Sequence, residues 1–161
     1  MRVRYGSGFE PVPAASMRRR VERLEAVIEQ APQVDCPVRH HFAPGIYMRE
    51  MTIPAGVVLT GAVHKTEHLN IVLRGHIAAN TADDVAERRG GDIFVSLPGL
   101  KRAGVALEET VWITIHANPT NETDLDKLVP MLVEATNAQL LGGRENRQLA
   151  HAAAVAELEQ S

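Results

Sequence analysis

The sequence predicts an all-β domain with a helical segment at each end, and three observations lead to this prediction. Between residues 34 and 118, short runs rich in β-branched residues recur at intervals of roughly ten residues, with Pro and Gly between them. No long helical segment separates these runs, which favours antiparallel pairing in a sandwich or small barrel. On either side, residues 1–33 and 119–161 place apolar residues at helical spacing.

Length and composition indicate an ordinary globular chain. It has 161 residues, of which 45% are hydrophobic and 23% charged, so two independent cores are not expected. Seventeen Lys and Arg against 20 Asp and Glu leave no basic excess, which disfavours nucleic-acid binding. The single cysteine, Cys36, excludes an internal disulfide framework. No long apolar run or secretory signal is present, so we expect a cytoplasmic protein that does not bind membranes.

The N-terminal segment, residues 1–33, is predicted to be an arm followed by an amphipathic helix. Pro11 and Pro13 hold the arm extended, and Ser16 is the expected helix cap. An apolar stripe follows, and it needs a partner, either the body of the same chain or a second subunit; both remain open, and we expect a homodimer. The stripe consists of Val21, Leu24, Val27 and Ile28.

The central segment, residues 34–118, is predicted to form eight short strands. Breakers rich in Gly, Pro and Asn separate them. We expect the strands at residues 46–53, 57–63, 67–74, 75–80, 84–88, 92–97, 102–108 and 111–117.

The C-terminal segment, residues 119–161, is predicted to return to helix. Thr123 is the expected cap, with Asp126 at the capping-box position. Pro130 interrupts the apolar stripe that follows and is expected to kink the helix. Residues 145–160 are rich in alanine and are also predicted to be helical.

Two histidines lie between two glycines at a recognisable spacing. Between Gly56 and Gly75, His64 and His68 are four residues apart. This spacing resembles the first conserved motif of the cupin superfamily: Gly, five residues, His, one residue, His, three or four residues, Glu, six residues, Gly. In that alignment His64 takes the second His position, His68 takes the Glu position, and Ala62 takes the first His position.

A second segment begins fifteen residues after the first motif ends. It carries Gly91, Pro98 and Gly99, followed by Arg102 and Ala106. This order resembles the second cupin motif: Gly, five residues, Pro, one residue, Gly, two residues, His, three residues, Asn. Both glycines register and the proline is displaced by one place, while Arg102 takes the His position and Ala106 the Asn position.

The resemblance covers roughly residues 40–117 and implies a cupin-type double-stranded β-helix, or jelly-roll barrel, with helices at both ends. The stretches 40–50, 64–68 and 110–116 also resemble small cupin-like proteins of bacteriophage genomes. Cupins usually bind a metal ion in the barrel through four ligands. The resemblance implies that this chain keeps His64, replaces the Glu with His68, and loses the other two ligands to Ala62 and Arg102.

The residues themselves support half a metal site. If the chain stays extended or turns tightly between His64 and His68, both imidazoles face one cavity. Two imidazoles suit zinc, iron, nickel or copper, and manganese is a further candidate metal. A complete site needs further ligands, for which His116 and Glu50 are the candidates.

Arg102 constrains what the cavity holds. At an effective dielectric of about 20, two unit charges about 4 Å apart repel by roughly 4 kcal/mol, and a dication beside a guanidinium by about twice that. An anion between the two converts repulsion into attraction. We therefore expect either a metal with an anionic ligand, or an anion held by Arg102 together with Lys101 and no metal.

The predicted function is a cupin-fold protein with a degenerate metal site that binds a small anionic ligand, with a metal-dependent enzyme as one form of it. The alternative is a non-enzymatic phage accessory or virion-associated protein that uses the barrel as a scaffold. A barrel filled by side chains and an N-terminal helix buried between subunits would favour this alternative. Sequence motifs for a nucleophile elbow, a Walker loop or a dinucleotide-binding loop are absent.

Overall fold

A computed structural model describes residues 14–134 and 148–150. Its helices are α1 (Ala14–Glu29) and α2 (Leu125–Leu132). Its strands are β1 (Val38–Ala43), β2 (Gly45–Ile53), β3 (Val57–Thr60), β4 (His68–Arg74), β5 (His76–Asn80), β6 (Val85–Arg89), β7 (Ile93–Ser96), β8 (Ala103–Ala106), β9 (Thr110–Asn118) and β10 (Gln148–Ala150).

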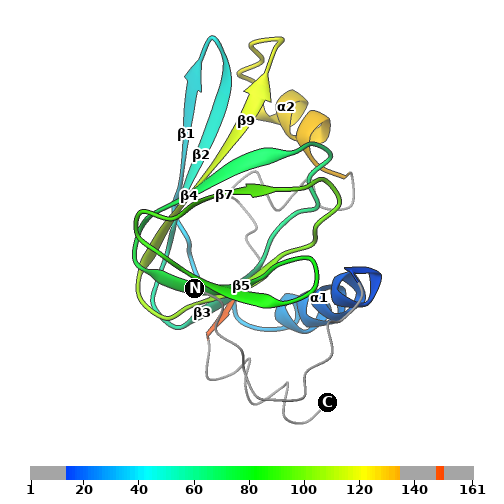
Figure 1. The fold of residues 1–161 in the computed structure, drawn as a ribbon, viewed down its shortest axis with the longest axis vertical. Helices are drawn as coiled ribbons and strands as arrows, with labels where there is room; N and C mark the ends of the chain where they lie inside the picture. The colour runs from blue at the N-terminus through cyan, green and yellow to red at the C-terminus, as the bar shows by residue number, and fades with distance from the viewer. Residues whose placement is uncertain (1–13, 135–147, 151–161) are drawn as a thin grey trace.

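The strands form two five-stranded antiparallel sheets that face each other (Figure 1). Sheet A has the order β1-β2-β9-β4-β7, and sheet B has the order β10-β3-β8-β5-β6. Apart from the hairpins β1–β2 and β5–β6, consecutive strands lie in different sheets, as in a jelly roll. The all-β prediction is confirmed, and each of the eight predicted strands overlaps one of the strands β2 to β9.

Two strands were not predicted. β1 pairs with β2 over six positions, from Val38 opposite Met51 to Ala43 opposite Ile46. Prolines on both sides of β1 and its charged residues hide the strand pattern in the sequence. β10 pairs with β3, so the prediction of helix over 145–160 is wrong at residues 148–150; the rest of that prediction lies outside the described residues.

The turn between β4 and β5 depends on Gly75. Its φ is +93°, a left-handed conformation that glycine adopts without strain. A Cβ at this position would collide with the backbone of Glu109 and Thr110. The glycine that ends the first motif is therefore required by the close approach of the turn to the start of β9.

Helix α1 packs on its own barrel rather than leaving its apolar stripe unpartnered (Figure 1). Ile28 is completely buried and forms a small cluster with Val58 of β3, against which Leu24 also packs. The helix begins at Ala14, so Ser16 lies inside it and the prediction that Ser16 caps it is wrong. Of the two partners left open for this stripe, the structure supplies the chain's own body.

Helix α2 is short and lies beside one end of β9 (Figure 1). Asp124, not Thr123, is its N-cap, and the Asp124 side chain accepts a hydrogen bond from the backbone of Asp126. The helix ends two residues after Pro130. Its buried residues form a cluster with Tyr47 of β2 and Ala62.

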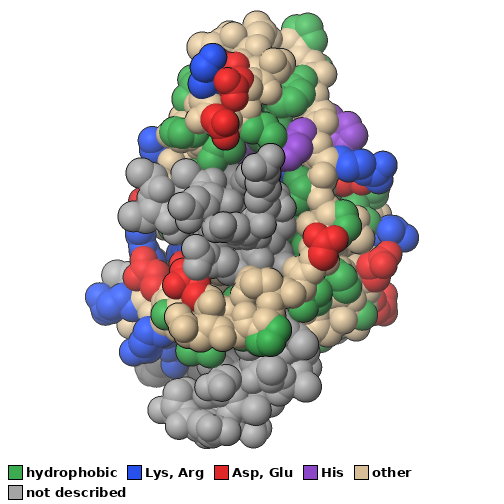
Figure 2. All heavy atoms as spheres, turned by 180° about the vertical axis from the view of Figure 1, so that it is seen from behind, with side chains coloured by type: hydrophobic (Ala, Val, Ile, Leu, Met, Phe, Trp, Pro, Cys, Tyr) green, Lys and Arg blue, Asp and Glu red, His purple; other side chains and the backbone are tan. Residues whose placement is uncertain are grey.

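Charged side chains of both signs are interspersed on the face shown in Figure 2. In the part of the chain that the structure describes, neither helix has the length and apolar character needed to cross a bilayer.

A buried ion pair joins α1 to the barrel. The Lys101 ammonium, with a side chain 1% exposed, contacts a Glu25 carboxylate oxygen at 2.6 Å. The Thr60 hydroxyl donates to the same oxygen at 3.0 Å. These contacts compensate the desolvation of the two charges.

We expect Glu25→Ala to lower the free energy of unfolding by about 3 kcal/mol, because it leaves the Lys101 ammonium buried without its carboxylate. Glu22→Ala, on the exposed side of the same helix, serves as the control and is expected to cost less than about 1 kcal/mol. Urea denaturation of both variants measures the difference. Equal, small effects would show that the ion pair contributes little.

Candidate metal centre and anion cavity

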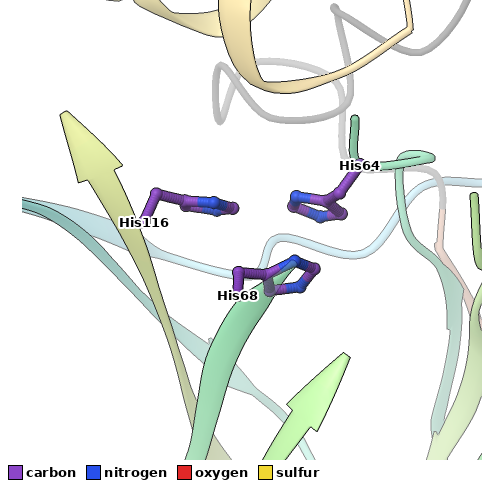
Figure 3. A group of neighbouring side chains, drawn as sticks. All are labelled: His64, His68 and His116. Carbon is purple, nitrogen blue, oxygen red and sulfur yellow. The ribbon is translucent and has the colours of Figure 1, made fainter. Parts of the chain in front are cut away.

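Three histidines from different segments converge inside the barrel (Figure 3). His116 lies on β9, His68 opens β4, and His64 precedes the turn that leads into β4. One nitrogen atom from each ring lies within 4.8 Å of those of the other two. The ring centroids are 4.1 Å apart for His64 and His68, and 4.9 Å for each of the other pairs.

The backbone around His64 is fixed from two sides. His64 forms an isolated antiparallel bridge with Val133, just after α2, and the neighbouring Lys65 N–H donates to the Leu132 carbonyl at 2.8 Å. The Gly99 N–H donates to the His64 carbonyl at 2.9 Å. The chain turns between His64 and His68, which is the second of the two geometries expected from the sequence.

The tautomer of His68 follows from its hydrogen bond. Its Nδ1 lies 3.0 Å from the Thr66 carbonyl oxygen. A carbonyl only accepts, so Nδ1 carries the proton and Nε2 holds the lone pair. This is the usual way in which a ligating histidine is oriented for a metal ion.

His116 is held by stacking. The Tyr47 ring lies parallel to it with a centroid distance of 6.0 Å. The Tyr47 hydroxyl is in turn 2.8 Å from Nδ1 of His40. The fully buried Tyr47 therefore fixes the plane of His116 without using either ring nitrogen.

All three imidazoles are neutral at neutral pH. Burial, reinforced by the neighbouring imidazoles and Arg49, lowers the pKa of His64 to about 2 and that of His116 to about 3. Burial also lowers the pKa of His68. Nδ1 of His64 and both ring nitrogens of His116 are buried without a hydrogen-bond partner.

These orphaned nitrogens fit a metal ion. A buried polar atom without a partner costs on the order of 1–3 kcal/mol, and coordination removes that cost. In a tetrahedral zinc site the ligand nitrogens are about 3.4 Å apart. The observed limit of 4.8 Å is within a small side-chain adjustment of this spacing.

His64 and His68 border a cavity of about 90 Å³, which has room for several water molecules. Strand register arranges the inner face of sheet A in rows, with imidazoles nearest α2, polar groups next and apolar groups deepest. The rows are His116 and His68, then Arg49, Thr114 and Asn70, then Met51 and Trp112.

Arg102 enters the same cavity from the sheet B side. Its guanidinium donates to the Ser96 hydroxyl at 2.6 Å and to the Asn80 carbonyl at 2.8 Å. Ser96 also accepts from Asn70, whose amide oxygen accepts from Trp112. Burial lowers the pKa of Arg102 to about 10, so it remains charged at neutral pH.

Arg49 is a second buried guanidinium in the cavity, and it was not predicted. It lies on β2 opposite Thr114, and burial lowers its pKa. Among the described residues that line the cavity, none is an Asp or a Glu. The alternation along β2 was a usable signal, because a strand that points Tyr47 and Met51 inward also points Arg49 inward.

Comparison with solved structures identifies the fold. A mutant salicylate 1,2-dioxygenase from Pseudoaminobacter salicylatoxidans is similar over 74% of this chain and 38% of its own, with 12% identity and a TM-score of 0.50. The chain has the cupin-type jelly-roll fold.

In two further similar structures, the match to this chain covers most of the other protein. One is a cupin-2 domain containing protein from Shewanella frigidimarina, with 15% identity, 58% of this chain, 90% of that chain and a TM-score of 0.44. The other is an RmlC-like cupin protein from Desulfovibrio desulfuricans, with 19% identity, 50% of this chain, 81% of that chain and a TM-score of 0.42. No protein-family model and no curated protein sequence matches the chain.

Two predicted site residues lie outside the cupin-type cavity. Glu50 points to the outer face of β2, between the inward Arg49 and Met51, and binds Arg39 at 2.7 Å and His41 at 2.9 Å. It is not near the three histidines, so its assignment as a metal ligand is corrected.

Lys101 likewise does not line the cavity with Arg102. Successive residues of an extended chain point to opposite faces, so the inward Arg102 sends Lys101 toward α1. There it pairs with Glu25, and its assignment as a ligand-binding residue is corrected.

The lowered pKa values predict a pH-dependent stability of the metal-free protein. In the unfolded chain the histidines bind protons below about pH 6.5, whereas His64 and His116 in the fold do not. Stability is therefore expected to fall as pH drops from 7 to 5, by up to about 1.4 kcal/mol per pH unit for each imidazole. Urea denaturation after chelation tests this, and His64→Gln should flatten the slope while His41→Gln, at the surface, should not. An unchanged slope in His64→Gln would contradict the assignment.

Proposed function

We propose that this cupin-fold protein holds a divalent metal ion through His64, His68 and His116, and binds a small anion beside it. The observation that carries the proposal is the convergence of three neutral imidazoles, two of which, His64 and His116, have buried ring nitrogens without a hydrogen-bond partner. Surface or core histidines normally satisfy their ring nitrogens. A metal ion is the simplest group that binds one nitrogen of each of the three rings at once.

The chemistry of the three imidazole ligands narrows the choice of metal ion. Three imidazoles without a carboxylate or thiolate suit zinc, iron, nickel or copper better than manganese, magnesium or calcium. Three protein ligands leave coordination positions for water or a small molecule, as in catalytic rather than structural zinc sites. When bound, the metal supplies a Lewis acid inside the barrel.

The anion is supported by the charge of the cavity. Arg49 is buried there, Arg102 is partly buried, and no described lining residue is acidic. A metal ion adds two positive charges to these guanidinium groups, and their mutual repulsion amounts to several kcal/mol. A carboxylate or phosphate offsets this repulsion and accepts hydrogen bonds from the guanidinium groups.

The deeper wall of the cavity is apolar, which favours an organic anion with an apolar body over a bare inorganic ion. If the organic anion is a substrate, the guanidinium groups of Arg49 and Arg102 orient it for the reaction. A barrel packed solid would favour the scaffold alternative, a phage accessory or virion-associated protein, whereas the cavity of about 90 Å³ supports the binding protein. The apolar wall is formed by Met51, Ile53, Leu59, Ile77, Ala79 and Trp112.

Metal binding is tested by loading chelated protein with Zn²⁺ and measuring bound metal and affinity. We expect one ion per chain in the wild type. The His64→Ala, His68→Ala double variant is expected to lose more than about 100-fold in affinity, because two ligands are removed. His41→Ala, which removes a surface imidazole, is the control and is expected to bind like the wild type. Equal binding by the double variant and the wild type would refute the metal site.

Anion binding is tested by thermal shift with a panel of carboxylates and phosphates. Charge-assisted hydrogen bonds contribute about 1.5–3 kcal/mol each, so Arg49→Gln and Arg102→Gln are expected to weaken binding about 10- to 150-fold. Arg39→Gln changes the same charge on the outer surface and is the control. If all three variants are stabilised as strongly as the wild type, neither guanidinium anchors the anion.

A further inference from the structure

The outer face of β4 and β7 carries apolar side chains at alternate positions of both strands. Phe94 and Ser96 turn inward, so the alternate residues of β7 turn outward, as do those of β4. Ile93 is 66% exposed and Leu97 62%. The register places Leu69 opposite Val95 and Ile71 opposite Ile93, which joins the two strands into one patch. This β4–β7 face consists of Leu69, Ile71, Leu73, Ile93, Val95 and Leu97.

β7, the edge strand of sheet A on this side, also lacks the residues that usually protect an edge strand from pairing with another chain. Edge strands of monomeric proteins normally carry charged residues or proline, which prevent pairing with another chain. The other edge of sheet A, β1, carries Arg39 and His41 outward, and β6 at the edge of sheet B carries Glu87, Arg88 and Arg89. β7 has the sequence Ile-Phe-Val-Ser and carries none.

The size of the face is that of a protein interface. An exposed branched side chain presents on the order of 100 Å² of apolar surface, so the five most exposed residues present on the order of 500 Å². A standard interface buries about 800 Å² per partner, of which a little more than half is apolar. The β4–β7 face therefore supplies the apolar share that a stable dimer needs.

The charge of the face points to a second copy of this chain as its partner. An interface about a twofold axis places each patch against itself, so any charge within it meets a like charge nearby. None of the six residues of the β4–β7 face is charged or polar, so self-association brings no such repulsion. The stripe of α1, the other candidate interface, is occupied by the chain's own β3.

We infer that two copies of this protein associate through the β4–β7 face, packing it against its twofold-related counterpart. The inner sides of the same two strands carry His68 and Ser96, which border the cavity. The dimer interface and the site thus lie on opposite faces of one pair of strands.

The test is the mass of the full chain in solution, measured by sedimentation velocity from about 1 to 100 µM. The wild type is expected at twice the chain mass of 17.6 kDa. Val95→Glu, at a position that is 50% exposed, is expected to be monomeric, with the dimer dissociation constant raised by at least about 100-fold. Val85→Glu makes the same change at a position that is 41% exposed on β6 and is expected to remain dimeric.

Circular dichroism of each variant verifies that it is folded. Leu97→Glu, which lies just beyond the end of β7, is a second disrupting variant in case Val95→Glu does not fold. A monomeric wild type at 100 µM would overturn the inference, as would a folded Val95→Glu or Leu97→Glu that stays dimeric. Dissociation by Val85→Glu as well as by Val95→Glu would also overturn it, because the effect would then not be specific to the β4–β7 face.

Discussion

The desolvation of three imidazoles is the constraint on which the rest of the site depends. His64, His68 and His116 are neutral because the barrel removes them from water and places them against one another. A neutral imidazole is a ligand, whereas a protonated one is not. The fold holds the three together through backbone bonds from the end of α2 and from Gly99 to the segment around His64. The end of α2 and Gly99 of the second motif thus position His64, whereas His68 and His116 lie on strands of sheet A.

Below the imidazoles, the cavity changes from basic to apolar. Arg49 and Thr114 form the next row, and Trp112 lies beneath them. Arg102 reaches the same level from sheet B and is held there by Ser96 and Asn80. Buried guanidinium groups with fixed positions lose little entropy when they bind a planar anion. The gradient from imidazoles to guanidinium groups to apolar side chains is the arrangement on which the proposed ligand, with an anionic head and an apolar body, is based.

Spacing in the sequence was sufficient to predict the barrel and part of the site. The spacing of Gly56, His64, His68 and Gly75 carried the resemblance to the first cupin motif. The structure adds the reason for Gly75, because a Cβ there would collide with the backbone of Glu109 and Thr110. His116 was named only as a candidate, because nothing local distinguishes it from other strand histidines; strand pairing with Tyr47 brings it inward. Arg49 was missed because it lies outside both motifs. The strand β10 was beyond prediction, because its alanine-rich surroundings favour helix and only pairing with β3 makes it a strand.

The wrong assignments of Glu50 and Lys101 to the site share one physical cause, which also explains the charge of the cavity. On β2, Glu50 follows Arg49, and before β8, Arg102 follows Lys101, so in each pair a shift of one residue exchanges inside for outside. In both cases the structure turns the arginine inward and the other charge outward. The outward charges bind neighbours, Glu50 to Arg39 and His41, and Lys101 to Glu25. The carboxylates of Glu50 and Glu25 thereby lie outside the barrel, and among the described residues that line the cavity two are arginines and none is acidic.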